Sequence, residues 1–596
     1  MTVRRPERFE DWLAGAQGLV ALAVLVGVGA GLGAIAFRYL ILGLTEVFAG
    51  HRDYSAVGHA ANGHVAPLGM WFVALVPVVG GLLYGPLVSR FAPEARGHGV
   101  PEVMLAVAEL GGHIRPRVPV VKALASAICI GSGGSVGREG PIVQIGSALG
   151  SMVGQVARVG ERRLRLLVAC GAAGGIAATF NAPIAGVFFA LEVILRDFET
   201  QSFAVVVLSS VTADAIARSV FGSASFLHLP GFVLVSPLEF VLYAVLGVLA
   251  GVAAVLFVRV LYGTEDLADR VWRGPAWARP AVGGVLLGGV LLVLPQMYGV
   301  GYPVLARAVQ GHYVIAFVLV LMAGKIVATS LTIAIGGSGG VFAPSLFMGA
   351  MLGSAFGQLA HSALPGVTGP GGAYALVGMG ALFAGAARAP ITAVIIVFEL
   401  TNEYSIVLPL MLAIVLATSV SARLSRDTIY TTKLRRRGIV FDRPRVVSVM
   451  RTMTVRDAMR PLPRALAADA PMSAVIERFT SSRDETVPVI TGADVLLGLV
   501  SAVDVEQHAL AESGLDTCAG YLAHTARELR ADDSLEQAVR ALSLSDDAGL
   551  PVLAETGASV VGWVTHRDVL RTYHRERERL TPGVTPRVPA LDGVTP

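Results

Sequence analysis

A glycine-rich break interrupts an apolar stretch of the chain at Gly131–Pro141, which reads GSGGSVGREGP. Two further breaks, GGVFAP at Gly339–Pro344 and GHGVP at Gly97–Pro101, have a similar composition. Proline after such a break suits the first turn of a helix, and a helix N-terminus presents free N–H groups and a partial positive charge. Non-helical backbone is tolerated at membrane depth only where protein buries it or where it lines a wet cavity. The three breaks therefore predict an anion site.

Glu139 lies inside the first break and is the candidate gate. An ionisable group at membrane depth indicates a function, and a carboxylate beside an anion site would compete with the anion until protonation released it. The alternative is a structural ion pair between Glu139 and Arg138. A phosphate-binding loop is disfavoured, because the break lacks the Gly-Lys-Ser/Thr sequence that would hold a nucleotide and its metal.

The composition places these residues in a membrane. Hydrophobic residues make up 54% of the 596 residues and charged residues only 15%, against about 25% charged in globular domains. Several uncharged stretches match the ~20 residues that a membrane helix needs, and the longest, residues 326–387, must fold back on itself more than once. Basic residues flank both ends of the apolar region, so the positive-inside rule predicts cytoplasmic N- and C-termini. These basic runs are topology signals and predict no nucleic-acid partner.

The apolar region contains an internal repeat. Residues 133–155 align with residues 336–358 at eleven of 23 identical positions, and residues 181–192 (NAPIAGVFFALE) match residues 388–399 (RAPITAVIIVFE) at nearly the same offset. Repeated halves of this kind indicate a transporter fold, with the binding site where the interrupted segments meet. Glu192 and Glu399 occupy the same place in the two copies, which favours a structural role for both over a role in transport.

The chain beyond residue 443 is polar and also repeats. GLVSAVD at Gly498–Asp504 and GWVTHRD at Gly562–Asp568 each follow a Val-Pro-Val or Leu-Pro-Val element. Each copy is predicted to form a helix, a strand, a turn, a strand and a helix.

The motifs GREGP, GVFAP and GHGVP resemble the three anion-pathway motifs of the CLC chloride channel and transporter family, over roughly residues 15–435. The resemblance implies an all-α polytopic membrane protein with broken helices and an inverted repeat, whose halves span approximately residues 15–225 and 235–435 after a cytoplasmic segment 1–14. It also implies a homodimer with one pore per subunit. In this reading Glu139 gates the pore, and the candidate anion-binding residues are His98, Arg138, Gly140, Val341, Phe342 and Tyr430.

The C-terminal repeats resemble a pair of cystathionine-β-synthase (CBS) domains, which implies a cytoplasmic α/β module. The predicted boundaries are 443–508 for the first domain and 515–575 for the second, followed by a flexible tail at 576–596. In that family the Ser/Thr and Asp of the final motif often hold the ribose of an adenine nucleotide, so the candidate nucleotide-binding residues are Ser501, Asp504, Thr565 and Asp568.

Two positions depart from the pattern of the CLC family. His98 replaces the usual serine of its motif, so the anion preference is open. Val193 stands directly after Glu192, where proton-coupled members usually carry a second glutamate. Valine carries no proton, which favours a passive, glutamate-gated chloride channel over the alternative, a proton-coupled Cl⁻/H⁺ antiporter.

Other classes fit the sequence poorly. A membrane receptor built around the CBS pair would need no anion motifs, and a divalent-cation transporter would need several carboxylates within the membrane. No nucleophile–base pair stands out, and the three widely spaced cysteines suggest neither a disulfide framework nor a metal site. We therefore expect an integral protein of the plasma (inner) membrane that is no enzyme, carries chloride or a similar small anion, and requires no cofactor apart from a possible adenine nucleotide at the CBS pair.

Overall fold

The computed structural model describes residues 16–60, 62–223, 235–369, 371–439, 450, 453–482, 484–491, 495–510, 519–525, 527–545, 547–554 and 559–580. The chain divides into two compact units, Met1–Phe441 and Asp442–Pro596. The predicted N-terminal segment 1–14 lies outside the described residues.

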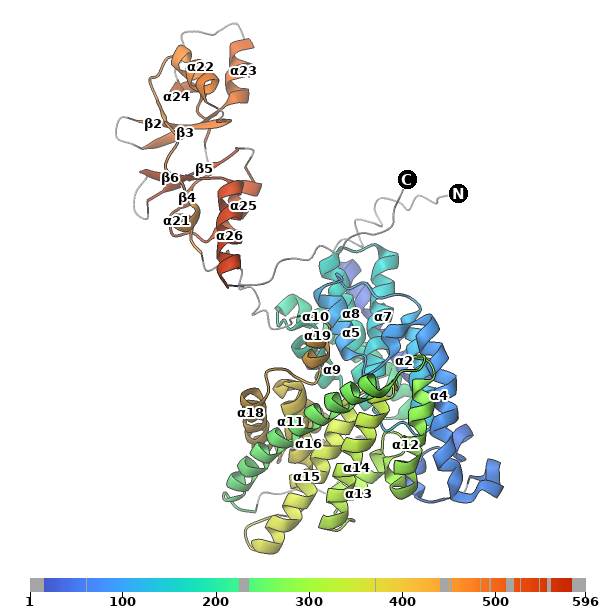
Figure 1. The fold of residues 1–596 in the computed structure, drawn as a ribbon. Coiled ribbons are helices and arrows are strands. Elements are labelled where there is room, and N and C mark those ends of the chain that lie inside the picture. The colour runs from blue at the N-terminus through green and yellow to red at the C-terminus, as the bar shows by residue number, and fades with distance from the viewer. Residues whose placement is uncertain are drawn as a thin grey trace. The chain divides into compact units, whose positions relative to one another are not determined.

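The first unit is helical throughout its described part (Figure 1). Its first half contains α2 (Ala16–Ala49), α3 (Tyr54–Val57), η1 (Gly63–Trp71), α4 (Phe72–Phe91), η2 (Pro93–Ala95), α5 (Val100–Ala108), α6 (Val118–Gly131), α7 (Glu139–Ala157), α8 (Glu161–Phe180), α9 (Pro183–Phe189), the π-helical turn η3 (Ala190–Leu195) and α10 (Thr200–Phe221). Its second half contains α11 (Glu239–Val271), α12 (Arg279–Val293), η4 (Pro295–Met297), α13 (Tyr302–Val309), α14 (Ile315–Ala334), α15 (Phe342–Ala363), α16 (Gly371–Ala387), α17 (Pro390–Thr401), α18 (Val407–Leu424) and α19 (Thr431–Arg436).

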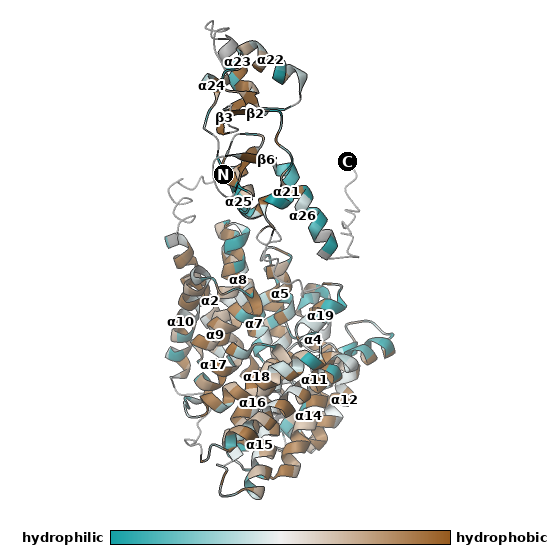
Figure 2. Ribbon diagram, turned by 90° about the vertical axis from the view of Figure 1, so that its left-hand side faces the viewer, coloured by the Kyte–Doolittle hydropathy of each residue, from teal (hydrophilic) through white to brown (hydrophobic). Residues whose placement is uncertain are grey.

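Seven helices in the described residues are long and apolar enough to cross a membrane, and Figure 2 shows the hydrophobic colouring that runs through this unit. The helix α2 has 34 residues and α11 has 33. At 1.5 Å per residue each is about 50 Å long, whereas the hydrocarbon core of a bilayer is only ~30 Å thick. Both helices must therefore tilt or extend beyond the hydrocarbon, and five shorter apolar helices pack among the long ones.

Most helices of the first half have a counterpart in the second half, which confirms the predicted repeat with broken helices. The same helix pairs pack together in both halves. The contact of α7 with α8 corresponds to that of α15 with α16, and the contact of α2 with α10 corresponds to that of α11 with α18. Small residues allow this close packing. A Cβ atom added to Gly171 would lie 1.9 Å from the carbonyl oxygen of Gly146, and one added to Gly378 would lie 2.4 Å from that of Gly349.

Glu192 and Glu399 form reciprocal contacts between the halves. The Glu192 carboxylate accepts hydrogen bonds from the N–H groups of Ile391 and Thr392 at the start of α17, at 3.1 and 2.8 Å. The Glu399 carboxylate accepts bonds from Ile184 and Ala185 at the start of α9, at 3.0 and 2.7 Å. Each glutamate thus caps a helix of the other half, which agrees with the structural role predicted for both.

The second unit contains two three-stranded sheets with the same topology, each with one parallel and one antiparallel pair of strands. Its elements are α21 (Val455–Ala458), β1 (Leu466–Ala467), α22 (Met472–Ser481), β2 (Thr486–Ile490), β3 (Leu496–Ser501), α23 (Ala502–Leu510), α24 (Ala519–Leu522), β4 (Leu529–Arg530), α25 (Leu535–Ser543), β5 (Leu550–Leu553), β6 (Val560–Val564) and α26 (His566–Leu580).

The short segment before the first subdomain packs into the core of the second subdomain, and the short segment before the second subdomain packs into the core of the first. Val455 and Ala458 are buried in the core of the second subdomain, and Ala519 is buried in the core of the first. The boundaries 443–508 and 515–575 therefore follow the order of the chain but not the packing of these short segments. The expected tail at 576–596 also needs a correction, because α26 continues to Leu580; residues 581–596 lie outside the described part.

Candidate functional site

The three glycine-rich breaks, far apart in the sequence, meet inside the first unit. Gly137 and Gly340 occupy equivalent positions in the two repeats and exchange two backbone hydrogen bonds of 2.7 and 2.6 Å. The third break joins them, because Gly97 donates to the carbonyl of Gly337 at 3.1 Å and accepts from Gly339 at 3.3 Å. Helices α5, α7 and α15 all begin beside this junction, and the N–H groups in their first turns have no intrahelical acceptors.

Glu139 is fully buried at the start of α7. Its Oε1 atom accepts a hydrogen bond from the phenol of Tyr302, and its Oε2 atom has no hydrogen-bond partner among the described residues. A Cβ atom added to Gly137 would lie 2.1 Å from Oε2 and 3.3 Å from the backbone nitrogen of Ala343. The carboxylate therefore folds back against Gly137 and the first turn of α15, where a helix dipole attracts negative charge.

Arg138 does not form the alternative ion pair with Glu139 in the described structure. Its guanidinium donates to the carbonyl of Thr179 at 3.3 Å and lies 5.4 Å from the centre of the Tyr302 ring. Arg138 and Glu139 thus meet at Tyr302 instead of at each other.

His98 lies in a buried polar cluster with two tyrosines. Its Nε2 atom is 3.3 Å from the hydroxyl of Tyr262, which donates to the carbonyl of Ile429 at 2.5 Å. The His98 and Tyr430 rings are 6.4 Å apart. The Tyr430 hydroxyl and His98 Nδ1 are buried without a hydrogen-bond partner among the described residues, so this cluster offers polar atoms that a ligand could satisfy.

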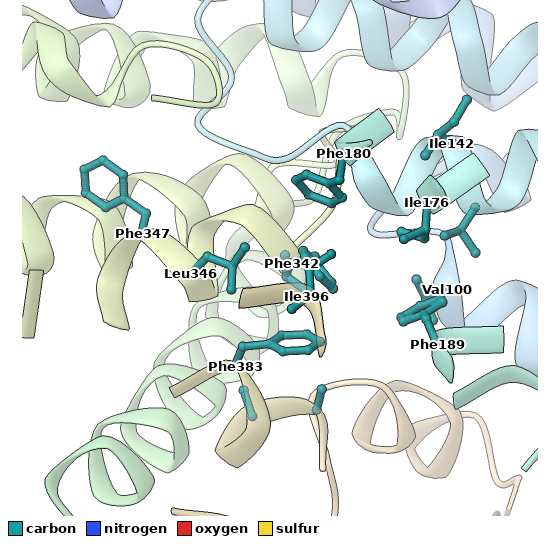
Figure 3. Packing of buried hydrophobic residues seen from close by; sticks show 14 of the residues in the cluster. Val100, Ile142, Ile176, Phe180, Phe189, Phe342, Leu346, Phe347, Phe383 and Ile396 are labelled. Carbon is teal, nitrogen blue, oxygen red and sulfur yellow. The ribbon is translucent and has the colours of Figure 1, made fainter. Parts of the chain in front are cut away.

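The remaining candidate anion-binding residues lie at the junction. Val341 is the N-cap of α15, Phe342 is its first residue, and Gly140 is the second residue of α7. A Cβ atom on Gly140 would lie 2.1 Å from the carbonyl oxygen of His98, so only glycine allows this approach. The Phe342 ring packs against Phe383, Phe180 and Phe189, with centroid distances of 4.3, 5.5 and 6.2 Å (Figure 3).

Two buried lysines, which the sequence analysis did not single out, hold the turns beside the junction. Lys122 donates to the carbonyls of Ala95 and Gly97 at 2.9 and 2.7 Å. Lys325 donates to the carbonyls of Gly299 and Val300 at 3.1 and 3.0 Å and to the Ser135 hydroxyl at 3.0 Å. Each lysine lies eleven residues before the aligned GGS sequence of its repeat, and this spacing was the available signal.

The sequence analysis also did not identify Tyr302 and Tyr262 as residues of the site. Residues 299–303 read GVGYP and are the second copy of GHGVP, so an extension of the repeat alignment would have found Tyr302. Tyr262 belongs to the long helix α11, and no sequence signal connects it with His98.

In the second unit each candidate hydroxyl is paired with its candidate carboxylate. The Ser501 hydroxyl donates to Asp504 and the Thr565 hydroxyl donates to Asp568, both at 2.6 Å. His524 lies 3.2 Å from Asp504 and 3.0 Å from Asp547, whereas Arg460 lies 3.6 Å from Asp568. Partial burial opposes ionisation of Asp504, but the hydrogen bonds from Ser501 and the neighbouring His524 ring outweigh it and lower the pKa of that carboxyl.

Comparisons with known proteins agree with this architecture. The family model described as voltage gated chloride channel matches residues 80–422, and a CBS domain model matches residues 528–575. The chain belongs to the voltage gated chloride channel (CLC) family. It is 35% identical over 422 residues to a ClcB-like chloride channel protein of Ralstonia nicotianae, which covers 70% of this chain and 97% of the relative. It is 37% identical over 385 residues to the H⁺/Cl⁻ exchange transporter ClcA of Vibrio parahaemolyticus, which covers 63% of this chain and 81% of that relative.

Solved structures of the CLC family have the same fold. A slow cyanobacterial Cl⁻/H⁺ antiporter superposes with a TM-score of 0.62 at 26% identity, over 70% of this chain and 97% of that chain. A eukaryotic CLC transporter superposes with a TM-score of 0.58 at 22% identity, over 92% of this chain and 97% of that chain. The protein is therefore an integral membrane protein of an anion-transporting family, with a CBS-containing C-terminal unit.

Proposed function

We propose that this CLC protein exchanges chloride for protons and that Glu139 is its gate. The observation that carries the proposal is the position of the Glu139 carboxylate, which is buried against the first turn of α15. There it occupies space that the helix dipole makes favourable for any anion. Protonation removes the charge of Glu139 and frees that space, so chloride and proton movement depend on the same group.

Chloride is proposed to bind at the junction of the three breaks. The N–H groups of Gly140, Val341 and Phe342 supply donors from two helix N-termini, and Arg138 adds positive charge nearby. The Nδ1 atom of His98 and the hydroxyl of Tyr430 supply further polar atoms that have no hydrogen-bond partner in the described structure.

Relatives support the coupled mechanism over the passive channel that Val193 favours. The Vibrio relative is named as an H⁺/Cl⁻ exchange transporter, and the cyanobacterial structure is that of a Cl⁻/H⁺ antiporter. A passive chloride channel remains the second candidate, because Val193 is a buried apolar residue at the place where coupled members usually carry a glutamate. In the coupled mechanism the proton must reach Glu139 by another residue or by water.

A reversal-potential measurement distinguishes the two candidates. The purified full-length protein is placed in liposomes that hold opposed chloride and pH gradients. A coupled exchanger reverses at a voltage that depends on both gradients, whereas a passive channel reverses at the chloride equilibrium potential. Reversal at the chloride potential would overturn the exchange proposal and leave the channel.

We also propose a homodimer in the plasma (inner) membrane with both termini in the cytoplasm. Helices α9, α10, α17 and α18 adjoin one another and expose large apolar side chains, among them Ile184, Phe203, Ile391, Leu408 and Met411. Subunit counting in liposomes tests the dimer, and labelling of single cysteines placed near each end of the chain tests the sidedness.

The CBS pair is proposed to bind an adenine nucleotide through Ser501 with Asp504 and Thr565 with Asp568. Each hydroxyl and carboxylate lie together at the start of a helix, where a ribose could replace the local hydrogen bonds. Calorimetry of the full-length protein with ATP, ADP and AMP tests the proposal, with Asp504→Asn and Asp568→Asn as variants. No heat at millimolar nucleotide would leave the pair with a dimerisation role only.

A further inference from the structure

Tyr302 contacts the gate from the opposite half of the molecule. It is the first residue of α13, and its phenol donates to Oε1 of Glu139 across a sequence separation of 163 residues. In the described structure no other side chain donates a hydrogen bond to this carboxylate, whose second oxygen is buried without a partner. Tyr302 is therefore placed to act on the charge state of Glu139.

The position of the Tyr302 ring is fixed by its surroundings. Lys325 holds the preceding turn through the carbonyls of Gly299 and Val300. Gly301 has a φ of +87°, a conformation that glycine adopts without strain, and this sharp turn starts α13 at Tyr302. The guanidinium of Arg138 lies over the ring at 5.4 Å from its centre. The phenol is thus a preorganised donor and needs little further ordering to reach Glu139.

The other half of the molecule has no counterpart to this phenol. In the matching turn GHGVP, the residue at the place of Tyr302 is Val100, which has no donor on its side chain. The matching residue of Glu139 in the second repeat is Phe342, which cannot accept such a bond. The tyrosine and the glutamate are therefore a pair that only one side of the pseudosymmetric junction contains.

We propose that Tyr302 is a positioning residue that holds Glu139 in its ionised, path-closing place and so sets the proton concentration at which the path opens. The proposal rests on the gate function proposed for Glu139. A phenol bonds more strongly to a carboxylate than to a neutral carboxylic acid, so it stabilises the closed state and opposes protonation. Without the hydroxyl, a lower proton concentration suffices to open the path.

Other charged and titratable groups also face the gate. Arg138 precedes Glu139, Lys325 approaches from α14, and the phenol of Tyr430 lies within electrostatic reach. Arg38 of α2 lies within electrostatic reach of Arg138 and Tyr302, and Asp53 within that of Lys325. All of these groups remain when Tyr302 becomes phenylalanine, so the substitution isolates the effect of the hydroxyl.

The test compares chloride efflux from liposomes as a function of the pH on each side in turn, for the wild type and Tyr302→Phe. The midpoint of acid activation should move by about one pH unit to higher pH, which is a ~10-fold lower proton concentration and the expected effect of one charge-assisted hydrogen bond. At the most acidic pH both proteins should carry chloride at the same rate, which also verifies folding. Tyr302→Met, which likewise lacks a hydroxyl, supplies the comparison if the phenylalanine variant does not fold.

Tyr298→Phe is the matched control. Tyr298 lies four residues before Tyr302, is buried, and donates its hydroxyl to the carbonyl of Gly131 at 2.6 Å. Its substitution removes the same atom but no contact with the gate, so the midpoint should not move. A Tyr302→Phe midpoint equal to that of Tyr298→Phe would overturn the proposal.

Glu139→Gln separates this proposal from the one on which it rests. If Glu139 is the gate, Glu139→Gln has no pH dependence, and adding Tyr302→Phe changes nothing further. A flat profile for Glu139→Gln together with an unshifted Tyr302→Phe would overturn the role of Tyr302 alone. A wild-type profile for Glu139→Gln would instead overturn the gate.

Discussion

The two halves of the membrane unit share one plan but carry different side chains in their matching turns. The turn GHGVP of the first half places the imidazole of His98 beside Tyr262 and Tyr430. The turn GVGYP of the second half places the phenol of Tyr302 on Glu139. Backbone geometry, lysine anchors and helix caps repeat between the halves, whereas His98, Tyr302 and Glu139 have apolar residues at the matching positions of the other half. An inverted repeat thus supplies a symmetric frame, and a few unmatched side chains give its two sides different chemistry.

The largest effect is expected from Glu139→Gln, which replaces the charged group by a neutral one of the same volume and so removes the main chemical difference between the two halves. Proton movement should fall to background while chloride flux persists without pH dependence, because the amide can neither bind a proton nor compete as an anion. Paired chloride and proton fluxes from liposomes measure both quantities. Glu399→Gln, a change of the same kind at a helix cap, should keep the coupling. Loss of folding in Glu139→Gln would instead assign the Glu139 carboxylate a structural role.

The lysine anchors test whether the frame is symmetric. Lys122→Met and Lys325→Met each leave two buried carbonyls without a charged donor. Each should lower the free energy of unfolding by about 2 kcal/mol, measured by thermal unfolding in detergent, whereas the exposed Arg90→Met should have no such effect. Wild-type stability for one lysine variant alone would show that the two anchors are not equivalent.

The two capping glutamates, Glu192 and Glu399, also test whether the frame is symmetric, with a smaller expected effect on stability. Glu192→Gln and Glu399→Gln each keep an oxygen acceptor but remove the negative charge from a helix N-terminus. Both should lose about 1 kcal/mol of stability, and the two losses should be similar because the contacts are equivalent. Thermal unfolding with chloride flux as a second readout tests this. A loss of coupling without a loss of stability would assign either glutamate to transport.

His98 tests the chemistry of the first half. In His98→Ser a small hydroxyl donor replaces the ring, so chloride should gain over nitrate by about fivefold, the value of one hydrogen bond of ~1 kcal/mol. Bi-ionic reversal potentials give the ratio. Val300→Ser, at the matching place of the second turn, is the control and should keep the wild-type ratio. An unchanged ranking in His98→Ser would mean that this ring does not contact the anion.

The smallest expected effect is that of Asp504→Asn in the CBS pair, whose two repeats carry matching Ser/Thr–Asp pairs. The pKa of Asp504 is lowered in the folded protein, so its ionised form stabilises the fold above about pH 4 and this contribution disappears as the pH falls below that value. Asp504→Asn should cost no more than about 0.5 kcal/mol at pH 7, because solvent screens the partly exposed group. Unfolding of the full-length protein at pH 7 and pH 3 measures the difference. A cost that persists at pH 3 would contradict the electrostatic origin.

Much of the fold was predictable because its signals are local. Uncharged stretches of membrane length, glycine-rich breaks followed by proline, and two aligned repeats gave the helical membrane unit and its broken helices. The polar composition after residue 443 gave the C-terminal unit. The exchange of the segments at Val455 and Ala519 was not predictable, because short apolar segments fit either of two similar cores.

The candidate site likewise contains residues that the sequence predicted and contacts that it did not. Glu139 stood out because a carboxylate in a glycine-rich break within apolar sequence is unusual, and the structure places it fully buried beside the start of α15. Arg138 was weighed as its ion-pair partner because the two are neighbours in the sequence. Neighbouring residues need not face each other, however, and in the folded chain Arg138 turns toward Thr179 and the Tyr302 ring.

By itself, the sequence determined that the chain crosses a membrane, that it repeats, and that its breaks offer helix N-termini to an anion. These properties depend on composition and spacing along a single segment. Only the tertiary structure decided which side chains meet at the breaks: Tyr302 on Glu139, Tyr262 on His98, and each capping glutamate on the opposite half. Such pairs join residues more than 160 positions apart. Their contact depends on how all the intervening helices pack, and no local periodicity records that packing.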